Sequence, residues 1–303
     1  MSKIDDIALF VAVVKASGLA AAGRKVGLSP ASMTARINAL EQRYNTRLLT
    51  RTTRKITLTD AGQKFYEIAL RIVADMSEVE TVLKQGTNEL SGSLRITAPS
   101  DFGRQFVAPA LASFVKKNRN VKPCLYLNEG VINIAEQGID LAIRFGNLPD
   151  SNLIIKKLAN NRRLLCASPE YIEQYGQPQK PEDLYNHRCL VLERLGEPLN
   201  EWHFKENGKI KTIKVKPALI ANDGALIRQW AVAGMGITIK SFWDIKDDLT
   251  SGRLISLLDE YIQGFHASDN NSVGLQLIYP ERRYVPRQVK EFINYFEETL
   301  TDI

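Results

Sequence analysis

Hydroxyl and arginine side chains gather in two short stretches between residues 29 and 54. In the first, PASMTAR, the residues Ser32, Thr34 and Arg36 lie off the apolar face of the predicted helix, so they stay available to a partner. In the second, RTTRK, Arg51 and Arg54 stand among threonines. Such side chains reach phosphate oxygens and base edges. The two stretches therefore predict contacts with double-stranded nucleic acid.

The distribution of charge points in the same direction. The formal net charge is +6, and residues 1–60 hold ten Lys or Arg against four Asp or Glu. Residues 61–303 hold thirty of each. Positive charge confined to one end of a chain indicates a polyanionic partner, with nucleic acid as the usual one. The alternative is a solvated basic surface that binds nothing.

Groups suited to catalysis do not form a recognisable motif. The three histidines, His187, His203 and His266, stand in no metal or nucleophile motif, and the sequence holds neither G-x-S-x-G nor a P-loop. The three cysteines are far apart in apolar surroundings, which predicts buried thiols. We therefore expect a protein without enzyme activity or cofactor. An enzyme acting on an acid stays open as an alternative, as does a solute-binding protein fused to an architectural DNA binder.

Three helices are predicted to position the first stretch. Apolar residues at helical spacing predict a helix over residues 4–16, and a helix of small residues follows at 19–26. Gly27 ends the second helix, and Ser29 caps a third that has Pro30 at its first position. Two short helices joined in this way form a helix-turn-helix, and the basic tail after them fits a β-hairpin wing. A small helical domain without a role in DNA binding is the alternative.

A long helix is predicted from Thr59, its N-cap, to about Glu89. Its apolar residues recur every three or four positions and are Phe65, Ile68, Ile72, Met76, Val79 and Val82. A narrow apolar stripe on a helix of this length favours a dimer contact. Packing on its own domain is the alternative. Residues 86–93, GTNELSGS, predict the break into the next domain.

From Leu94 onward, short apolar strands alternate with helices. Such a texture predicts an α/β region with a mostly parallel sheet. The predicted strands include SLRITAP, VKPCLYLN, DLAIRFG, RLLCASP, KVKPALI and GITIKS. The predicted helices are FVAPALASFVKK, VINIAEQG, GALIRQWAVAG and RQVKEFINYFEETL.

Four short motifs stand along the N-terminal part: Leu28-Ser29, Leu40-Glu41, Arg51-Thr52-Thr53-Arg54 and Thr59-Asp60-Ala61-Gly62. In these motifs the N-terminal part resembles the winged helix-turn-helix of the LysR-type transcriptional regulators. The resemblance implies that Ser29, Pro30, Ser32, Thr34 and Arg36 face DNA, with Arg51 and Arg54 in the wing. Ala35 and Ala20 depart from the family's usual residues, so two common contacts are absent.

The C-terminal part contains the stretches GRQFVAPALASF, NLIIKKLANNRRLLCASPEYI, RQWAVAGMGITIKSFWDI and LLDEYI. In these stretches the resemblance continues, and it is nearest to the subgroup of the D-malate-utilisation regulator. It implies a DNA-binding domain at 1–58, a linker (dimerisation) helix at 59–91 and an effector-binding domain at 92–303 of the periplasmic-binding-protein type. The first lobe is expected at 92–162 and 268–303, and the second at 163–267. The implied effector is a small acyclic acid, malate- or aspartate-like.

Ligands of open α/β lobes lie beyond the carboxyl ends of strands. At three such ends stand Ser100 and Phe102, Arg144 and Gly146, and Asn222; Trp202 and His203 are expected to close the mouth. Arg144 could clamp an acid with two hydrogen bonds. Three alternatives remain: Ser100 as a simple N-cap, Arg144 paired with Asp140 or Asp101, and His203 as a surface or packing residue.

Assembly and location follow from the same observations. No apolar run is long enough to span a membrane and no secretory signal opens the chain, so we expect a cytoplasmic protein. The resemblance implies homodimers that pair into a tetramer on promoter DNA. It also implies that an acid bound between the lobes alters the spacing of the DNA-reading heads, and with it the contact with RNA polymerase.

Overall fold

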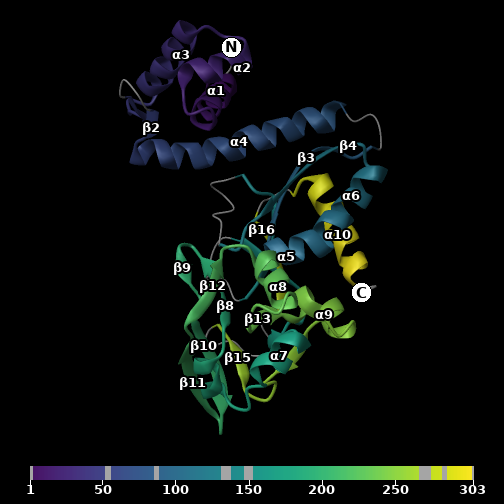
Figure 1. Ribbon diagram of the computed structural model, residues 1–303. Coiled ribbons are helices and arrows are strands. Elements are labelled where there is room, and N and C mark those ends of the chain that lie inside the picture. Colours follow the sequence, from purple (N-terminus) through teal and green to yellow (C-terminus); the bar gives the residue numbers. More distant parts are fainter. Residues whose placement is uncertain are drawn as a thin grey trace. The chain divides into compact units, whose positions relative to one another are not determined.

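The computed structural model describes residues 3–51, 56–84, 89–130, 138–146, 153–265, 274–281 and 285–301. They form two compact units, one that ends at Gly92 and one that begins at Ser93. Figure 1 labels the elements of each unit. Residues 131–137 of the predicted helix at 131–138, and the wing residue Arg54, lie outside the described residues.

The first unit opens with the three predicted helices. They are α1 (Lys3–Lys15), α2 (Leu19–Val26) and α3 (Pro30–Arg43). Gly27 ends α2 in the left-handed conformation, with φ +72°, and the Leu28 amide donates to Gly23 O at 2.9 Å. The Ser29 hydroxyl accepts the Ser32 amide at 3.1 Å, which satisfies a free donor of α3. The limits of α2 and the first residue of α3 agree with the prediction, and α1 begins and ends one residue earlier than predicted.

A short hairpin and a long helix complete this unit. Strand β1 (Leu49–Arg51) pairs antiparallel with β2 (Ile56–Leu58), and Arg51 lies opposite Ile56. Helix α4 (Asp60–Lys84) follows, capped by the Thr59 hydroxyl, which accepts the Gly62 amide at 2.9 Å. A Cβ atom at Gly62 would collide with the Leu48 carbonyl, so glycine allows the close approach of α4 to the hairpin.

The core of the first unit lies between α1, α3 and the start of α4. Phe10, Met33 and Leu40 are fully buried there, and the ring of Phe65 meets Phe10 edge to face at 5.1 Å. Further along α4, Ala69 and Leu70 pack on Ile7 and Val11 of α1. The first three turns of α4 are therefore held by their own unit.

The first lobe of the second unit contains a five-stranded sheet in the order β4-β3-β5-β16-β6. Its strands are β3 (Ser91–Ala98), β4 (Asn120–Leu127), β5 (Leu141–Phe145), β6 (Leu153–Ala159) and β16 (Leu275–Pro280). A helical run of α5 (Ser100–Phe102), the π-helical η1 (Gly103–Val107) and α6 (Ala108–Lys117) packs beside α10 (Arg287–Thr301), with Phe114 against Phe292.

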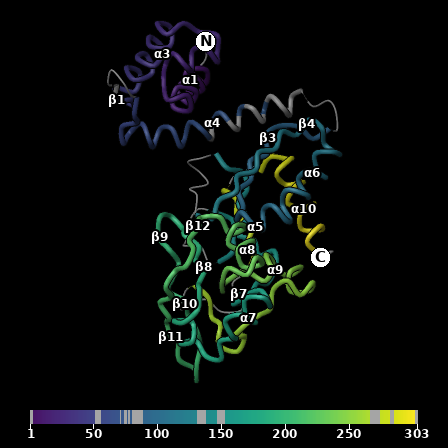
Figure 2. Tube along the Cα trace, viewed as in Figure 1, coloured from purple at the N-terminus to yellow at the C-terminus, as the bar shows by residue number. Residues whose placement is uncertain are grey.

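The second lobe is built from the intervening chain, residues 163–264. Its strands are β7 (Arg163–Ala167), β8 (Cys189–Arg194), β9 (Glu197–Pro198), β10 (Glu201–Glu206), β11 (Lys209–Lys214), β12 (Pro217–Ala221), β13 (Thr238–Ser241), β14 (Ile255–Leu257) and β15 (Ile262–Gly264). Its helices are α7 (Pro169–Tyr175), the 3-10 helix η2 (Pro181–Asn186), α8 (Gly224–Val232) and α9 (Phe242–Thr250). Figure 2 traces this part of the chain in teal and green. Strand β16 then belongs again to the sheet of the first lobe.

The prediction of a mostly parallel sheet is wrong. In the first lobe β3 and β5 are parallel, but β16 runs antiparallel to both β5 and β6. The reason is that β16 enters from the second lobe and crosses the sheet in the opposite direction. In the second lobe β8 and β12 are parallel, whereas β7 pairs antiparallel with β13 and β14.

Three smaller expectations can be compared with the described residues. No helix among them is long and apolar enough to cross a membrane. Over the same part of the chain, no group of His, Cys, Asp and Glu could hold a metal ion. Cys166 and Cys189 are buried, as predicted, and burial raises the pKa of each thiol to about 12. Cys124 is exposed on β4, so the prediction was wrong there.

Candidate functional site

The start of α3 exposes the hydroxyl groups that the sequence assigns to DNA. Ser29, Pro30 and Ser32 are exposed, and the two serine hydroxyls lie 2.9 Å apart. Thr34 is half-buried and donates to Pro30 O at 2.9 Å. The cap therefore holds these side chains at the N-terminus of α3. There the hydroxyl groups of Ser29, Ser32 and Thr34 lie within about one turn, in a position to contact a groove or a phosphate.

Arg36 has a different environment from the one expected. Its Nη2 lies 3.2 Å from Asp6 Oδ1, and Arg43 Nη1 lies 3.1 Å from the other oxygen of the same carboxylate. Only 19% of the Arg36 side chain is exposed. Asp6 thus joins α1 to α3 through two arginines, and Arg36 positions the helix that carries the serines. Arg51 is the last residue of β1 and lies opposite Ile56, the first residue of β2.

Glu41, part of the Leu40-Glu41 motif, is a positioning residue whose role was not predicted from the sequence. Its buried Oε1 accepts the Leu48 amide at 2.8 Å and the Leu49 amide at 2.9 Å. Arg47 lies 3.6 Å from the second oxygen. The carboxylate joins α3 to the strand that begins the wing, and therefore fixes the hairpin relative to the serines of α3.

In the second unit, Ser100 and Gly224 meet where the two lobes face each other. Both lie at the start of a helix, Ser100 after β3 and Gly224 after β12. Glu129 lies between them: its Oε1 accepts the Ser100 amide at 2.9 Å, the Ser100 hydroxyl and the Gly224 amide at 3.2 Å. Ser100 is not the cap of its helix, because Pro99 holds that position; its amide and hydroxyl instead form one side of a carboxylate site.

Arg144 is a buried cation on which Glu129 acts electrostatically. It is 7% exposed, donates to Thr97 Oγ1 at 2.8 Å and donates to the Ile143 carbonyl at 2.9 Å. Burial lowers its pKa to about 10, with Glu129 acting in the opposite sense. The alternative pairings considered from the sequence are not seen among the described contacts: Asp101 pairs with Lys240, and Asp140 accepts the Arg95 amide.

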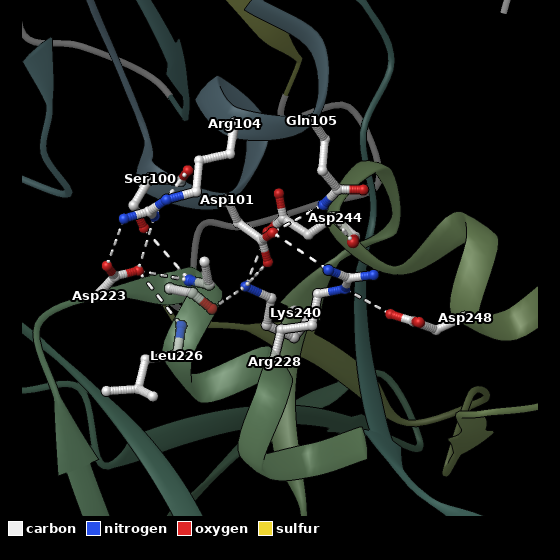
Figure 3. A network of polar contacts seen from close by, with 12 residues as sticks. Ser100, Asp101, Arg104, Gln105, Asp223, Leu226, Arg228, Lys240, Asp244 and Asp248 are labelled. Atoms are coloured by element: carbon white, nitrogen blue, oxygen red, sulfur yellow. Dashed lines mark hydrogen bonds and ion pairs between the residues drawn. The ribbon is translucent and has the colours of Figure 1, made fainter. Parts of the chain in front are cut away.

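A second polar cluster joins the lobes next to Ser100, and Figure 3 shows it from close by. Asp101 of the first lobe lies 2.8 Å from Lys240 Nζ, and Asp244 lies 3.2 Å from the same ammonium. Gln105 donates both to Asp101 and to the Asp244 carbonyl. Arg104 completes the contact with two hydrogen bonds of 3.2 and 3.0 Å to the Asp223 carboxylate.

Lys240 faces two buried carboxylates, Asp101 and Asp244, and Arg228 lies 3.9 Å from Asp101 as a second cation. Burial lowers the pKa of Lys240, but the carboxylates of Asp244 and Asp101 outweigh burial, so the net shift is upward. Burial also raises the pKa of Asp244 to about 6, against the opposing effect of Lys240. Asp101 and Glu129 add to the increase, and Arg163 opposes it. Lys240 therefore stays charged while Asp244 takes up a proton readily.

We expect stability to depend on pH through Asp244. A carboxyl whose folded pKa is raised binds more protons in the folded than in the unfolded state, so stability falls as the pH rises from about 4 to about 6. The side chain introduced by Asp244→Asn cannot ionise, so the variant does not lose this stability. Its free energy of unfolding, relative to that of wild type, should therefore rise by up to about 3 kcal/mol as the pH rises over this range. Thermal unfolding at pH 4.5, 5.5 and 7.0 measures the difference.

Asp247→Asn, at an exposed position of the same helix, is the matched control for this experiment. It should keep a nearly constant difference from wild type across the three pH values. A difference between Asp244→Asn and wild type that does not change with pH would contradict the assignment of the raised pKa to Asp244.

The other residues predicted to bind the effector, Phe102, Gly146 and Asn222, differ in how exposed they are and in what they contact. Phe102 is fully buried and stacks on Phe106 at 4.7 Å, so it packs the lobe contact and is not open to a ligand. Gly146 follows β5 with φ +112°, a conformation that favours glycine. Asn222 is exposed immediately before the cap of α8, Asp223.

The prediction that Trp202 and His203 close the mouth is corrected by the structure. Trp202 is 1% exposed within the core of the second lobe, where its Nε1 donates to the Leu199 carbonyl at 3.0 Å. His203 pairs with Thr212 on the neighbouring strand at 2.9 Å, as a surface residue of β10. Two facts explain the difference. Strand β10 lies in a separate sheet of the second lobe with β11 and β15. Because side chains alternate along a strand, Trp202 and His203 also point to opposite faces of that sheet.

Glu129 and Lys240 are the site residues that the sequence analysis missed. Glu129 follows β4 as Ser100 follows β3, so the strand-end argument could have found it. Lys240 lies inside β13, and only the fold brings it to Asp101. A winged helix-turn-helix unit, followed by two α/β lobes with a carboxylate site between them, defines the class of two-domain DNA-binding regulators.

Comparisons with known proteins agree with this class. Residues 4–63 match the family model "Bacterial regulatory helix-turn-helix protein, lysR family", and residues 87–301 match "LysR substrate binding domain". The chain belongs to the LysR family of bacterial transcriptional regulators, which confirms the resemblance seen in the sequence.

Several proteins are similar to this chain over most of its length. The HTH-type transcriptional regulator DmlR of Escherichia coli (strain K12) is 38% identical over 260 residues, 86% of this chain and 85% of that protein. The HTH-type transcriptional activator TtdR of the same strain is 31% identical over 290 residues, 96% and 91% of the two chains. The structure of CrgA from Neisseria meningitidis, 28% identical, covers 99% of both chains with a TM-score of 0.62.

Proposed function

We propose that this LysR-type regulator senses a small acyclic carboxylic acid, malate- or aspartate-like, and activates a catabolic gene for it. The observation that carries the proposal is the carboxylate site between the lobes. There the amides of Ser100 and Gly224 donate to one carboxylate oxygen, Oε1 of Glu129, which also acts electrostatically on the buried cation Arg144. Amides at helix starts, with an arginine nearby, suit a carboxylate ligand.

The proposed organisation has three parts, with the limits predicted from the sequence: DNA-binding residues 1–58, a linker helix at 59–91 and an effector domain at 92–303. The exposed serines of α3 support the first assignment. Exposed apolar side chains on α4 support the second, since a partner helix would bury them. A dimer presents two reading heads to a palindromic site, and pairing of dimers gives the tetramer.

The proposed response is a shift between two arrangements of the lobes. An acid can change DNA binding only by its different affinity for the two arrangements. The lobes meet through charged groups of both, such as Arg104 with Asp223, so a bound acid would act on their relative position directly. The reading heads would then change their spacing on promoter DNA and alter the contact with RNA polymerase. The protein would act in the cytoplasm, without catalysing a reaction.

Arg144→Ala tests the proposal. It should keep the affinity for the DNA upstream of its own gene within about two-fold, because α3 lies in the other unit. It should bind malate or aspartate at least about ten-fold more weakly, since a charged hydrogen bond is worth roughly 1.5–3 kcal/mol. Gel retardation and footprinting, with and without the acids, measure DNA binding and its response; calorimetry measures acid binding.

Arg119→Ala, which removes an exposed arginine of the first lobe, is the control and should respond like wild type. Arg144→Lys keeps the charge and separates loss of the cation from loss of packing. An unchanged acid response in Arg144→Ala would remove Arg144 from the site. If no acid alters the wild-type footprint, the protein is better explained as an architectural DNA binder. If wild type does not retard the DNA at all, the alternative of an enzyme acting on an acid is favoured.

A further inference from the structure

The carboxylate of Glu129 is held in a way that is unusual for a loop side chain. A single oxygen, Oε1, accepts the Ser100 amide, the Ser100 hydroxyl and, at 3.2 Å, the Gly224 amide. The first two donors belong to the first lobe and the third to the second lobe. Hydrogen bonds to a charged carboxylate are stronger than neutral ones, so Glu129 joins the two lobes.

The loop that carries Glu129 is set in place by its neighbours. The Asn128 amide donates to the Ala98 carbonyl at 3.0 Å, which holds the end of β4 beside the end of β3. The Asn128 side chain accepts the Gly130 amide at 2.6 Å and turns the chain directly after Glu129. The glutamate therefore enters the site from a defined turn of the first lobe.

The opposite side of the site leaves room for this one carboxylate. A Cβ atom at position 224 would lie 3.0 Å from Glu129 Oε1 and 3.4 Å from Lys240 Nζ, so glycine permits the close approach. Charge matches as well, because Glu129 acts electrostatically on both Arg144 and Lys240. Donors, space and charge together form a cradle for one carboxylate, and a side chain of the protein fills it.

We infer that Glu129 is an internal occupant of the effector site, and that an acid effector binds by displacing the Glu129 carboxylate from Ser100 and Gly224. This inference rests on the proposed function. The displaced ligand and the incoming one share their chemistry, a single carboxylate on the same three donors. The apparent affinity for an acid is then reduced by the fraction of molecules in which Glu129 occupies the cradle.

Competition of this kind sets a threshold for the response. A carboxylate tethered near its own site acts at a high effective concentration, so a weakly held acid does not displace it. Glu129 also discriminates among ligands. An acid must bring further contacts, such as a second carboxylate or a hydroxyl group, to replace a side chain that is already well bound.

Glu129→Ala in the full-length chain tests the inference by chemical rescue. Acetate and formate should raise the melting temperature of this variant and bind it at least about ten-fold more tightly than they bind wild type, since the internal competitor is gone. Sodium chloride at equal ionic strength should have no such effect. Glu173→Ala, which removes an exposed glutamate of α7, should behave like wild type. Equal acetate affinity in all three proteins would overturn the inference.

A second variant covers the case in which alanine prevents folding. Glu129→Gln keeps the shape but loses the charge, so hydrogen exchange of the Ser100 and Gly224 amides should accelerate; unchanged exchange would contradict the inference. The outcomes also separate the two proposals. Acetate rescue without binding of malate or aspartate to wild type upholds the cradle and rejects the proposed effector class. Acid binding to wild type that Glu129→Ala does not strengthen rejects the displacement alone.

Discussion

Ile68→Glu on α4 is expected to turn a dimer into a monomer and to weaken binding to a two-half-site promoter fragment by about 100-fold or more. Ile68, Met76 and Val79 are 49%, 37% and 49% exposed. Their spacing of eight and three residues places them along one side of the helix. A buried charge in a helix pair is costly, and a dimer that separates loses the effective concentration that couples its two DNA contacts.

Lys64→Glu is the matched control, since it also places a glutamate on an exposed position of α4. Lys64→Glu changes the net charge more than Ile68→Glu does, and in the direction that repels DNA. If this variant stays dimeric, the loss of the dimer in Ile68→Glu is due to the apolar face of α4. Analytical ultracentrifugation measures the oligomer, and gel retardation on whole and half sites measures DNA binding. A dimeric Ile68→Glu protein would show that another surface pairs the subunits.

The apolar stripe of α4 shows how much of a helix contact can be predicted from the sequence alone. The periodicity predicted one seam through six residues, but two of them have partners in their own unit. Phe65 packs on the core of α1 and α3, and Ile72 packs beside Ala69 and Leu70. Periodicity identifies which residues share a face of a helix. It cannot decide how much of that face the same chain covers, because the covering residues are distant in sequence.

The first unit was predicted well because its signals are local. A serine before a proline caps α3, a glycine in the left-handed conformation ends α2, and a threonine caps α4. Each of these signals acts within about four residues of its own position. The ion pair of Arg36 could not be predicted for the same reason, since its partner Asp6 lies thirty positions earlier in another helix.

The site between the lobes was predicted only in part, for a related reason. Ser100 and Arg144 follow strands, and the rule for open α/β sheets places such residues at the ligand side. Glu129 and Gly224 are 95 positions apart, and Asp101 and Lys240 are 139 positions apart. Their pairing depends on how two lobes dock, which no local pattern encodes. Trp202 was misplaced because the strand that carries it belongs to a different sheet.

Lys240→Met is expected to destabilise the second unit by about 3–5 kcal/mol, because it leaves two buried carboxylates without their shared counter-charge. The ammonium donates to the Gly224 carbonyl at 2.8 Å and lies within 3.2 Å of both Asp101 and Asp244. Methionine fills a similar volume, so a cavity does not account for the loss. At roughly 2–4 °C per kcal/mol, the melting temperature should fall by about 10 °C.

A double substitution separates the charge effect from any other. Asp244→Asn in the Lys240→Met background removes one of the two carboxylates and should recover part of the loss, a coupling that a double-mutant cycle measures. Lys205→Met, at an exposed position of β10, should melt close to wild type. A Lys240→Met protein that also melts within a degree of wild type would mean that the carboxylates are protonated or solvated without the lysine. Because Asp101 belongs to one lobe and Lys240 to the other, their contact would then contribute little to holding the lobes together.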